Sequence, residues 1–370
     1  MGPPFRADHV GSLLRPVAVL QARERHQAGQ ITAEQLRAVE DDAIRDAVRM
    51  QEEVGLQAAT DGELRRRSWH MDFIYQLGGI GHARSELQTA TFHTDTGETL
   101  ISAQGALRVD GKIRLEHTIF GDDFDVLRSL TTSATPKLTI PSPNMIYARG
   151  GRAAIDETVY PDLDEFWADV VAAYREELRQ LHARGCKYMQ LDDTSLATIN
   201  DSHLREEIAR RGDDPETLHL VFVRRLNEVL AAKPDGMTVT THMCRGNYRS
   251  AWAASGSYDF VGEALFGELA VDGFFVEYDD ERSGGFEPLR FVPKGRRVVL
   301  GVVTTKRGEL VSKEELKRRI EEASRFVDFD QLCLSPQCGF ASTVEGNELT
   351  YEEQVAKLRL VVETAAEIWG

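Results

Sequence analysis

Residues 162–193 read DLDEFWADVVAAYREELRQLHARGCKYMQLDD, and this stretch has the pattern of a helix followed by a strand. From 162 to 184 the apolar side chains recur at steps of three and four residues, which is the spacing of one helix face; they are Phe166, Val170, Val171, Tyr174, Leu178 and Leu181. Gly185 predicts the end of that helix, because glycine readily adopts the left-handed conformation found there. The run 187–192 then predicts a buried strand. A helix that leads directly into a strand is typical of parallel sheets.

The same alternation continues along the chain. Eight short apolar or β-branched runs predict strands, at 5–11, 57–62, 137–141, 187–192, 237–242, 273–277, 297–303 and 331–335. Further helical periodicity occurs at 33–54, 214–232, 313–326 and 351–368. Eight strands that alternate with helices predict an α/β fold of the (β/α)8 TIM barrel type.

One region departs from this alternation. Between 91 and 118 polar and apolar residues take turns, and Asp95-Thr96-Gly97 and Asp110-Gly111 are turn signals. We therefore expect an inserted antiparallel β-hairpin segment, at about residues 85–130. The rest of 1–370 is expected to form a single TIM-barrel catalytic domain, since barrels of about 250 residues or more fold as one unit.

Composition and charge restrict the classes of partner. The 370 residues include 44 basic and 60 acidic side chains, and the resulting net charge of -16 opposes nonspecific binding to nucleic acid or anionic lipid. No apolar run approaches the roughly 18 residues of a membrane span, and no secretory signal is recognisable. Four cysteines are too few for a disulfide framework in a chain of this length. We expect a cytoplasmic protein with no nucleic-acid or membrane partner, and the composition is compatible with a homo-oligomer.

Chemically active side chains follow several of the predicted strands at the point where each strand ends. They are Ser12 after the first strand, Asp61 and Glu63 at the second, Asp192 and Asp193 at the fourth, His242 and Cys244 at the fifth, Glu277 at the sixth and Cys338 after the eighth. Because catalytic residues of such barrels lie at the carboxyl ends of the strands, these side chains are expected to share one mouth. Two thiolates and an imidazole are ligands that zinc prefers, and three ligands with a weak or open fourth position are typical of a catalytic site. Cys244, Cys338 and His242 therefore predict a catalytic zinc site.

The chain resembles the cobalamin-independent methionine synthases, in particular the short forms that correspond to the catalytic C-terminal barrel of the longer enzymes. Six motifs, spread over most of the chain, carry the resemblance: HVGS at 9–12, DGE at 61–63, QLDD at 190–193, HMC at 242–244, VEYD at 276–279 and PQCG at 336–339. The resemblance implies a Zn2+ site made by His242, Cys244, Glu277 and Cys338. It also implies that homocysteine is held near Ser12, Glu63 and Asp192, and that the duplicated N-terminal barrel of the longer enzymes is absent.

The chemistry of these residues agrees with that implication. Zinc with two thiolates and one carboxylate would carry a net negative charge, which makes it a poor activator of water but a suitable partner for a substrate thiolate. Thiol alkylation is the reaction expected of such a site. Glu63 and Asp192 could bind the ammonium group of an amino acid, and backbone N–H groups near Gly11 and Ser12 could bind its carboxylate.

The expected donor site departs from the family pattern. Family members that use methyltetrahydrofolate have a tryptophan near the end of the third strand that stacks on the pterin, but residues 140–144 here read IPSPN. The family's histidine after the seventh strand, which assists proton transfer, corresponds here to Lys306. Trp69 and His70 follow Glu63 and could stack on or protonate a donor. Lys306 and His70 are therefore the predicted catalytic proton donors, since the amine of a folate is a poor leaving group unless it is protonated.

The three arginines that follow Glu63 have two interpretations. Arg65, Arg66 and Arg67 could bind an anionic donor tail, or they could form a solvated turn with salt bridges. Cys186 and Cys333 lie in apolar runs and are expected to be packing residues.

Together these observations predict a zinc-dependent methyltransferase of methionine biosynthesis. It would transfer a methyl group from 5-methyltetrahydrofolate, or from a related donor, to the thiol of homocysteine. The alternatives are a zinc-dependent alkyltransferase that acts on another thiol or uses methylcobalamin, a barrel decarboxylase like the uroporphyrinogen enzymes, and a zinc-binding protein without activity. A sulfonate thiol would prefer cationic partners over Glu63 and Asp192.

Overall fold

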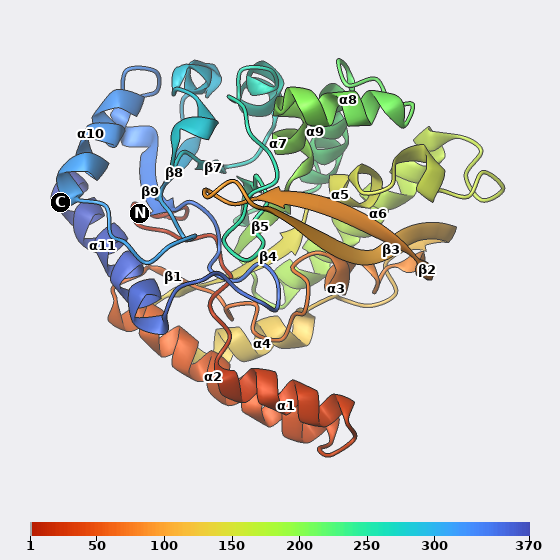
Figure 1. The fold of residues 1–370 in the computed structure, drawn as a ribbon, viewed down its shortest axis with the longest axis horizontal. Coiled ribbons are helices and arrows are strands. Elements are labelled where there is room, and N and C mark those ends of the chain that lie inside the picture. The colour runs from red at the N-terminus through yellow and green to blue at the C-terminus, as the bar shows by residue number, and fades with distance from the viewer. Residues whose placement is uncertain (1) are drawn as a thin grey trace.

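The computed structural model describes residues 2–370, except for the side chains of 82–88 and 104–105. Seven strands form one parallel sheet in the order β1-β4-β5-β6-β7-β8-β9, and Figure 1 shows this sheet curled into a half-barrel. Its strands are β1 (Ala58–Ala59), β4 (Thr135–Pro141), β5 (Tyr188–Asp193), β6 (Thr238–Met243), β7 (Gly273–Glu277), β8 (Arg297–Val303) and β9 (Leu332–Pro336). The predicted α/β class and the parallel sheet are confirmed.

Helices connect and cover the strands. The longer ones are α1 (Val17–Gln27), α2 (Ala33–Glu53), α4 (Gly121–Leu130), α6 (Leu163–Ala183), α8 (Ser202–Arg210), α9 (Leu218–Leu230), α10 (Lys313–Ala323) and α11 (Tyr351–Trp369). Short helices and helical turns are α3 (Met71–Ile74), α5 (Asn144–Ala148), α7 (Ser195–Asn200), η1 (Gly151–Ala154), η2 (Glu263–Glu268), η3 (Glu281–Ser283), η4 (Glu287–Phe291) and η5 (Phe329–Gln331). Among the described residues, no helix combines the length and the apolar character that crossing a membrane requires.

Local sequence explains where the predicted helices begin. At α2 the Thr32 hydroxyl accepts the Gln35 N–H at 3.2 Å, and the Gln35 side chain accepts the Thr32 N–H at 2.9 Å. Thr350 and Glu353 form the same reciprocal pair at the start of α11. These pairs satisfy N–H groups that have no partner within the helix, and each is worth about 1 kcal/mol.

The predicted first strand, 5–11, is not a strand of the sheet. It makes a single parallel bridge, Ala7 to Leu334, next to β9. The Asp8 carboxylate instead accepts the N–H groups of Phe5 at 3.2 Å and His9 at 2.8 Å, so these donors are satisfied without a neighbouring strand. The predicted strand at 57–62 is likewise reduced to β1. Among the described residues, the parallel sheet therefore has seven strands, joined by one bridge from segment 5–11, and a complete eight-stranded barrel is not shown.

Between β1 and β4 lies the antiparallel hairpin of β2 (Gly78–His93) and β3 (Thr99–Arg114). It begins earlier than the expected alternation at 91, and α4 occupies part of the span that we assigned to the insertion. Figure 1 shows the hairpin crossing the sheet as two long orange strands. At its tip the backbone N–H of His93 donates to the Trp252 carbonyl at 2.7 Å, and the backbone N–H of Trp252 donates to the His93 carbonyl at 2.9 Å. The hairpin is thereby fixed to the loop that follows β6.

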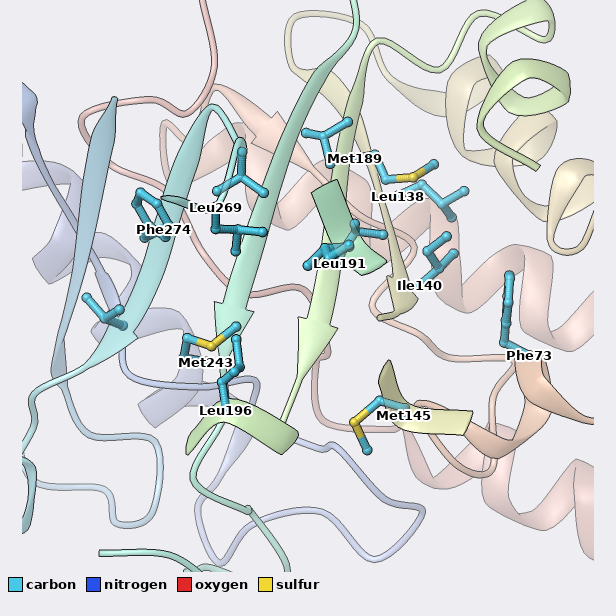
Figure 2. Packing of buried hydrophobic residues seen from close by; sticks show 14 of the residues in the cluster. Phe73, Leu138, Ile140, Met145, Met189, Leu191, Leu196, Met243, Leu269 and Phe274 are labelled. Atoms are coloured by element: carbon cyan, nitrogen blue, oxygen red, sulfur yellow. The ribbon is translucent and has the colours of Figure 1, made fainter. Parts of the chain in front are cut away.

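The two faces of the strands are chemically different. Outward-facing side chains such as Leu138, Ile140, Met189 and Leu191 belong to the main hydrophobic core (Figure 2), where each fully buried residue of this kind contributes about 1.5–3 kcal/mol. Alternate positions point the other way, because successive strand residues face opposite sides. On β5 this second set ends with Asp192 at the carboxyl end of the strand, where the candidate site lies.

Candidate metal centre and adjoining cavity

Four potential metal ligands meet at the carboxyl ends of neighbouring strands. His242 lies on β6, Cys244 follows it, Glu277 ends β7, and Cys338 follows β9. One ligand atom from each residue lies within 4.8 Å of the other three. Cys244 Sγ is 3.6 Å from Cys338 Sγ, and His242 Nε2 is 3.7 Å from Glu277 Oε1. The cluster that the sequence suggested is thus brought together by the parallel sheet.

The chemistry of this cluster fits a zinc ion. All four side chains are buried, and both ring nitrogens of His242 lack a hydrogen-bond partner within the described part of the chain. Buried polar atoms without partners are rare in folded proteins, and a metal ion would satisfy one of these two nitrogens. Two sulfurs, one imidazole nitrogen and one carboxylate oxygen are a donor set that zinc accepts in tetrahedral sites.

The electrostatics of the cluster also favour a cation. A hydrogen bond with Cys244, together with His242, holds the pKa of the Cys338 thiol well below its ordinary value. Burial raises the pKa of Glu277 to about 7, with a further contribution from Cys338, whereas Lys306 lowers it. Glu277 also accepts the backbone N–H of Arg245 at 3.3 Å. Concentrated negative charge that is this strongly buried needs a positive partner.

A cavity adjoins three of the ligands, His242, Cys244 and Cys338. Its wall also contains the three residues predicted to bind an amino acid, Ser12, Glu63 and Asp192. Further contributors are Trp69, Arg149 and Tyr248, together with Ala90, Phe92 and Ser102 of the hairpin. The cavity therefore joins the metal cluster to the predicted substrate residues, and the hairpin forms part of its wall.

Glu63 is held in place but keeps one free acceptor. Its Oε1 accepts the Thr139 hydroxyl at 2.8 Å and lies 3.7 Å from Arg66 Nη1. Its Oε2 is buried and has no partner among the described residues. Burial raises the pKa of Glu63, and Arg66 opposes this shift. A ligand with a donor or a positive charge would satisfy this oxygen.

Asp192 and Ser12 complete this side of the cavity. Burial raises the pKa of Asp192 to about 7, while His242 lowers it, and Asp192 Oδ1 accepts the Gln190 amide at 2.7 Å. The Ser12 hydroxyl accepts the Ala341 N–H at 3.3 Å. Gly339 makes room for it, since a Cβ there would lie only 1.9 Å from Ser12 Oγ.

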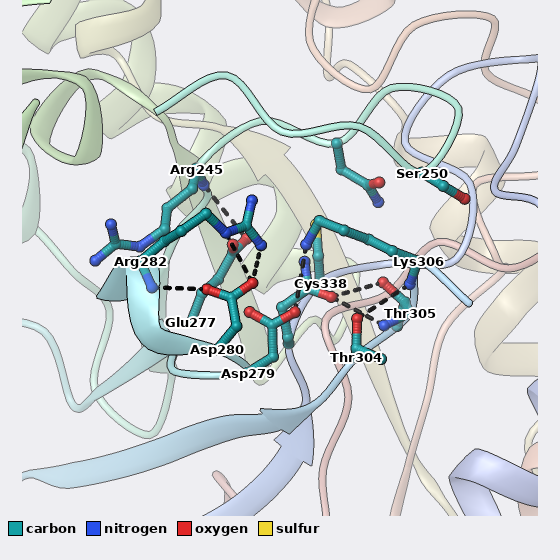
Figure 3. A network of polar contacts seen from close by, with 12 residues as sticks. Arg245, Ser250, Glu277, Asp279, Asp280, Arg282, Thr304, Thr305, Lys306 and Cys338 are labelled. Carbon is teal, nitrogen blue, oxygen red and sulfur yellow. Dashed lines mark hydrogen bonds and ion pairs between the residues drawn. The ribbon is translucent and has the colours of Figure 1, made fainter. Parts of the chain in front are cut away.

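The two predicted proton donors do not line the cavity. Lys306 is 4% exposed, and Figure 3 shows it next to Cys338, with Nζ 3.4 Å from Asp279 Oδ2. Burial would lower the pKa of Lys306, but Asp279 and Glu277 raise it, so this side chain is a cation. His70 is fully buried, and its Nδ1 lies 3.2 Å from the Ser68 hydroxyl. Burial, with Arg149, holds the pKa of His70 well below its ordinary value, so at neutral pH this ring is uncharged.

The arginines after Glu63 are largely engaged in the fold. Arg65 is paired with Asp41 and lies 3.3 Å from Asp123. Arg66 donates to the Thr139 carbonyl at 2.7 Å and stacks over Phe120 at 4.3 Å. Of the three, only Arg67 has an exposed side chain. The salt-bridged interpretation therefore describes Arg65 better than an anion-binding role.

Several wall residues could not be found from the sequence. Arg149 belongs to no motif, and its place becomes visible only when α5 is seen to follow β4 at the carboxyl side of the sheet. Phe92 and Tyr248 meet with ring centroids 5.2 Å apart, although one lies on the hairpin and the other in the loop after β6. That contact depends on how the hairpin folds back, for which the sequence has no local signal.

Comparison with known proteins agrees with this geometry. Residues 123–367 match the family model described as cobalamin-independent synthase, catalytic domain. The chain belongs to this family. The resemblance read from the six motifs is therefore confirmed.

Members of the cobalamin-independent synthase family match nearly the whole chain. YxjH of Bacillus subtilis, an uncharacterised protein, is 49% identical over 368 residues, which are 99% of this chain and 95% of YxjH. A methionine synthase of Pyrococcus horikoshii is 23% identical over 335 residues, 89% of this chain and 84% of that protein. A solved structure from Listeria monocytogenes, a candidate vitamin-B12 independent methionine synthase, has a TM-score of 0.79 at 36% identity and covers 100% of this chain and 99% of its own.

A more distant structure has the same fold. A B12-independent methionine synthase from Shewanella sp. W3-18-1, solved with selenomethionine, has a TM-score of 0.72 at 18% identity and covers 98% of this chain and 97% of its own. At that identity the likeness concerns the fold alone.

Proposed function

We propose that this protein is a zinc-dependent methyltransferase that transfers a methyl group from 5-methyltetrahydrofolate, or a related donor, to the thiol of homocysteine and so forms methionine. The observation that carries the proposal is the four-ligand cluster beside a cavity with two buried carboxylates. Membership of the cobalamin-independent synthase family, with relatives named methionine synthase, supports it. We further propose that residues 1–370 act as one catalytic domain of TIM-barrel type.

The metal would be held by His242, Cys244, Glu277 and Cys338. When bound, zinc would supply one function here, which is to keep the acceptor thiol deprotonated at neutral pH. The two cysteines and Glu277 would make the site electron-rich, which preserves the reactivity of a thiolate. Three of the ligands border the cavity, so a thiol in the cavity can approach the cluster.

The acceptor would be oriented by charge. The unpartnered Oε2 of Glu63 and the carboxylate of Asp192 suit the ammonium group of homocysteine. Both groups have raised pKa values because they are buried, and an incoming cation would lower these values and stabilise the ionised forms. Ser12 lies on the same wall, where its backbone could bind the carboxylate of the amino acid.

A proton must reach the leaving amine if the donor is a folate. Lys306 suits this role better than His70, because it is cationic and lies beside the metal ligands, whereas burial keeps His70 neutral. Lys306 is nevertheless held near Asp279 and away from the cavity wall, so the proton would have to pass through a bridging water. A methylated corrinoid would need no such proton.

Substitution of the cysteine ligands tests the metal assignment. Cys244→Ser and Cys338→Ser are expected to lose most of the bound zinc and to reduce methionine formation by about 100-fold or more, because each removes a thiolate ligand. Cys333→Ser is the matched control, since Cys333 is also buried and reduced but belongs to a separate apolar cluster. Zinc content and methionine formation are measured for all three variants. If the Cys244 and Cys338 variants retained both, the proposal would be wrong.

A further inference from the structure

Arg149 is an arginine without an assigned role on the cavity wall. It lies at the carboxyl end of α5, directly after β4 and its following turn. Its side chain borders two cavities, the one at the metal cluster and a second between α5, α7, α8 and α9. Arg149 and Thr194 are common to both walls, so these two residues lie between the two cavities.

The guanidinium of Arg149 has no partner in the described part of the chain. No ion pair, hydrogen bond or ring-face contact is made by it, and its Nε is fully buried. Arg149 is half-buried, and the buried arginines Arg15 and Arg66 of the same region have partners for most of their donors. Arg15 donates to the carbonyls of Ala341 and Thr343 at 2.9 and 2.7 Å, and Arg66 pairs with Glu63 and Thr139. An unpaired cation in such a position is costly unless a ligand neutralises it.

Arg149 remains charged at neutral pH. Burial lowers its pKa only to about 10, and Cys244 acts in the opposite direction. Arg149 in turn lowers the pKa of His70. The Arg149 guanidinium is thus close enough to Cys244 to interact with it electrostatically, although no described residue of the cavity forms an ion pair with Arg149.

The acceptor has other partners for its charges. Glu63 and Asp192 suit its ammonium group, and the backbone near Ser12 suits its carboxylate. The wall of the second cavity is mixed: it has apolar side chains such as Met145 and Phe222 as well as the polar Ser195 and Arg211. A larger ligand of the cavity at the metal cluster that carries an oxygen acceptor would neutralise the guanidinium.

We propose that Arg149 contacts an anionic or carbonyl oxygen of the methyl donor and restricts this cavity to neutral or anionic donors. Donors whose methyl group is carried by a sulfonium or a quaternary ammonium are excluded by charge repulsion. The inference rests on the proposed methyl transfer, but it concerns binding of the donor, which requires no turnover.

Equilibrium binding to the zinc-loaded protein tests this role. The probes are 5-methyltetrahydrofolate, S-methylmethionine as a sulfonium, and homocysteine, each titrated calorimetrically into wild type, Arg149→Met and Arg149→Lys. Arg210→Met is the matched control, because Arg210 is an exposed arginine of α8 that pairs only with Glu207 at 3.6 Å. Circular dichroism confirms that each variant is folded.

Arg149→Met is expected to weaken binding of 5-methyltetrahydrofolate by about tenfold or more, the effect of losing one charge-assisted hydrogen bond. Arg149→Lys should lose less affinity for 5-methyltetrahydrofolate, because lysine keeps the positive charge but not the planar donor geometry. Homocysteine binding should stay within about twofold, and S-methylmethionine should bind Arg149→Met more tightly than wild type. Arg210→Met should behave as wild type with every probe.

Three outcomes would overturn the inference. The first is a wild type that binds S-methylmethionine as tightly as 5-methyltetrahydrofolate, or that binds no folate. The second is an Arg149→Met variant with unchanged folate binding. The third is an equal loss of homocysteine and folate binding, which would assign Arg149 to the acceptor. If Arg149→Met lost folate binding and kept homocysteine binding, but the wild type formed no methionine, the contact with the donor would be supported and the proposed function refuted.

Discussion

At the scale of single residues, the candidate site is defined by buried polar atoms that the fold leaves without partners. The Oε2 of Glu63 and both ring nitrogens of His242 are buried without a hydrogen bond among the described residues. Folded proteins satisfy nearly all such atoms internally or with water, so these atoms indicate ligands. The positions of His242 and Glu63 after predicted strands could be read from the sequence. The lack of hydrogen-bond partners for these atoms could not.

Loss of charge at Glu63 or Asp192 should affect the acceptor first. Glu63→Gln and Asp192→Asn preserve shape but remove a partner of the ammonium group, so the KM for homocysteine should rise by about 10- to 100-fold. The zinc content should not change, because neither residue is a ligand. Steady-state kinetics and metal analysis check this, with the exposed Glu345→Gln as control. An unchanged KM for homocysteine in both variants would contradict the assignment.

Glu177 on α6 should make the stability of the protein depend on pH. Its Oε2 accepts the Ile119 N–H at 3.1 Å, its Oε1 has no partner in the described chain, and burial raises its pKa from 4.5 to about 8. Because the folded state binds this proton more tightly than the unfolded state, the corresponding stability is complete below pH 4.5 and is lost as the pH rises through 8.

In Glu177→Gln this loss should be absent. Between pH 5 and pH 8 the variant should therefore gain up to about 3 kcal/mol of unfolding free energy relative to wild type. Urea unfolding of both proteins at the two pH values measures the difference. Parallel pH dependence in the two proteins would show that Glu177 is not the group responsible.

At the scale of elements, the five predicted helices and most of the strands follow from local sequence, whereas α1, α4 and α8 were not predicted, and two further segments differ from the prediction. Segment 5–11 has the apolar content of a strand, yet the Asp8 side chain accepts the N–H groups of Phe5 and His9, and among the described residues one bridge to β9 forms. The hairpin begins at Gly78, well before the alternating pattern at 91. The sequence did not predict this start, because glycines at 78, 79 and 81 interrupt the alternation of polar and apolar residues. Hydrogen bonds to a side chain of the segment itself decide the first case, and pairing between β2 and β3 decides the second.

The tip of the hairpin should loosen when its ion pair is reversed. Asp95 Oδ2 lies 3.4 Å from Arg307 Nη1, in the loop after β8, and both groups are partly exposed. Asp95→Lys replaces attraction by repulsion, and since exposed pairs are worth about 0–1 kcal/mol, the His93 amide should exchange its hydrogen about 2- to 5-fold faster. Glu98→Lys makes the same charge change in the tip without breaking an ion pair. Equal exchange rates in the two variants, measured by hydrogen–deuterium exchange, would show that the pair does not hold the hairpin.

At the scale of the whole molecule, the parallel sheet explains why residues far apart in sequence form one site. Carboxyl ends of neighbouring parallel strands meet at one edge, so His242, Glu277 and Cys338 could be grouped from the strand order alone. The hairpin wall, the position of Arg149 and the depth of Lys306 could not, because they depend on how loops from β1 to β8 pack over that edge. The donor side of the cavity is therefore the part that required a structure.

The most direct test of zinc-dependent methyl transfer to homocysteine is a single-turnover experiment with methyl-labelled donor. Zinc-loaded and zinc-free protein are mixed with homocysteine and either 5-methyltetrahydrofolate or methylcobalamin under anaerobic conditions, and labelled methionine is measured. We predict labelled methionine from 5-methyltetrahydrofolate with the zinc-loaded protein only. If labelled methionine formed from methylcobalamin but not from 5-methyltetrahydrofolate, the methyl donor would be a corrinoid and not a folate. The absence of labelled methionine with either donor, despite bound zinc, would contradict the proposed function.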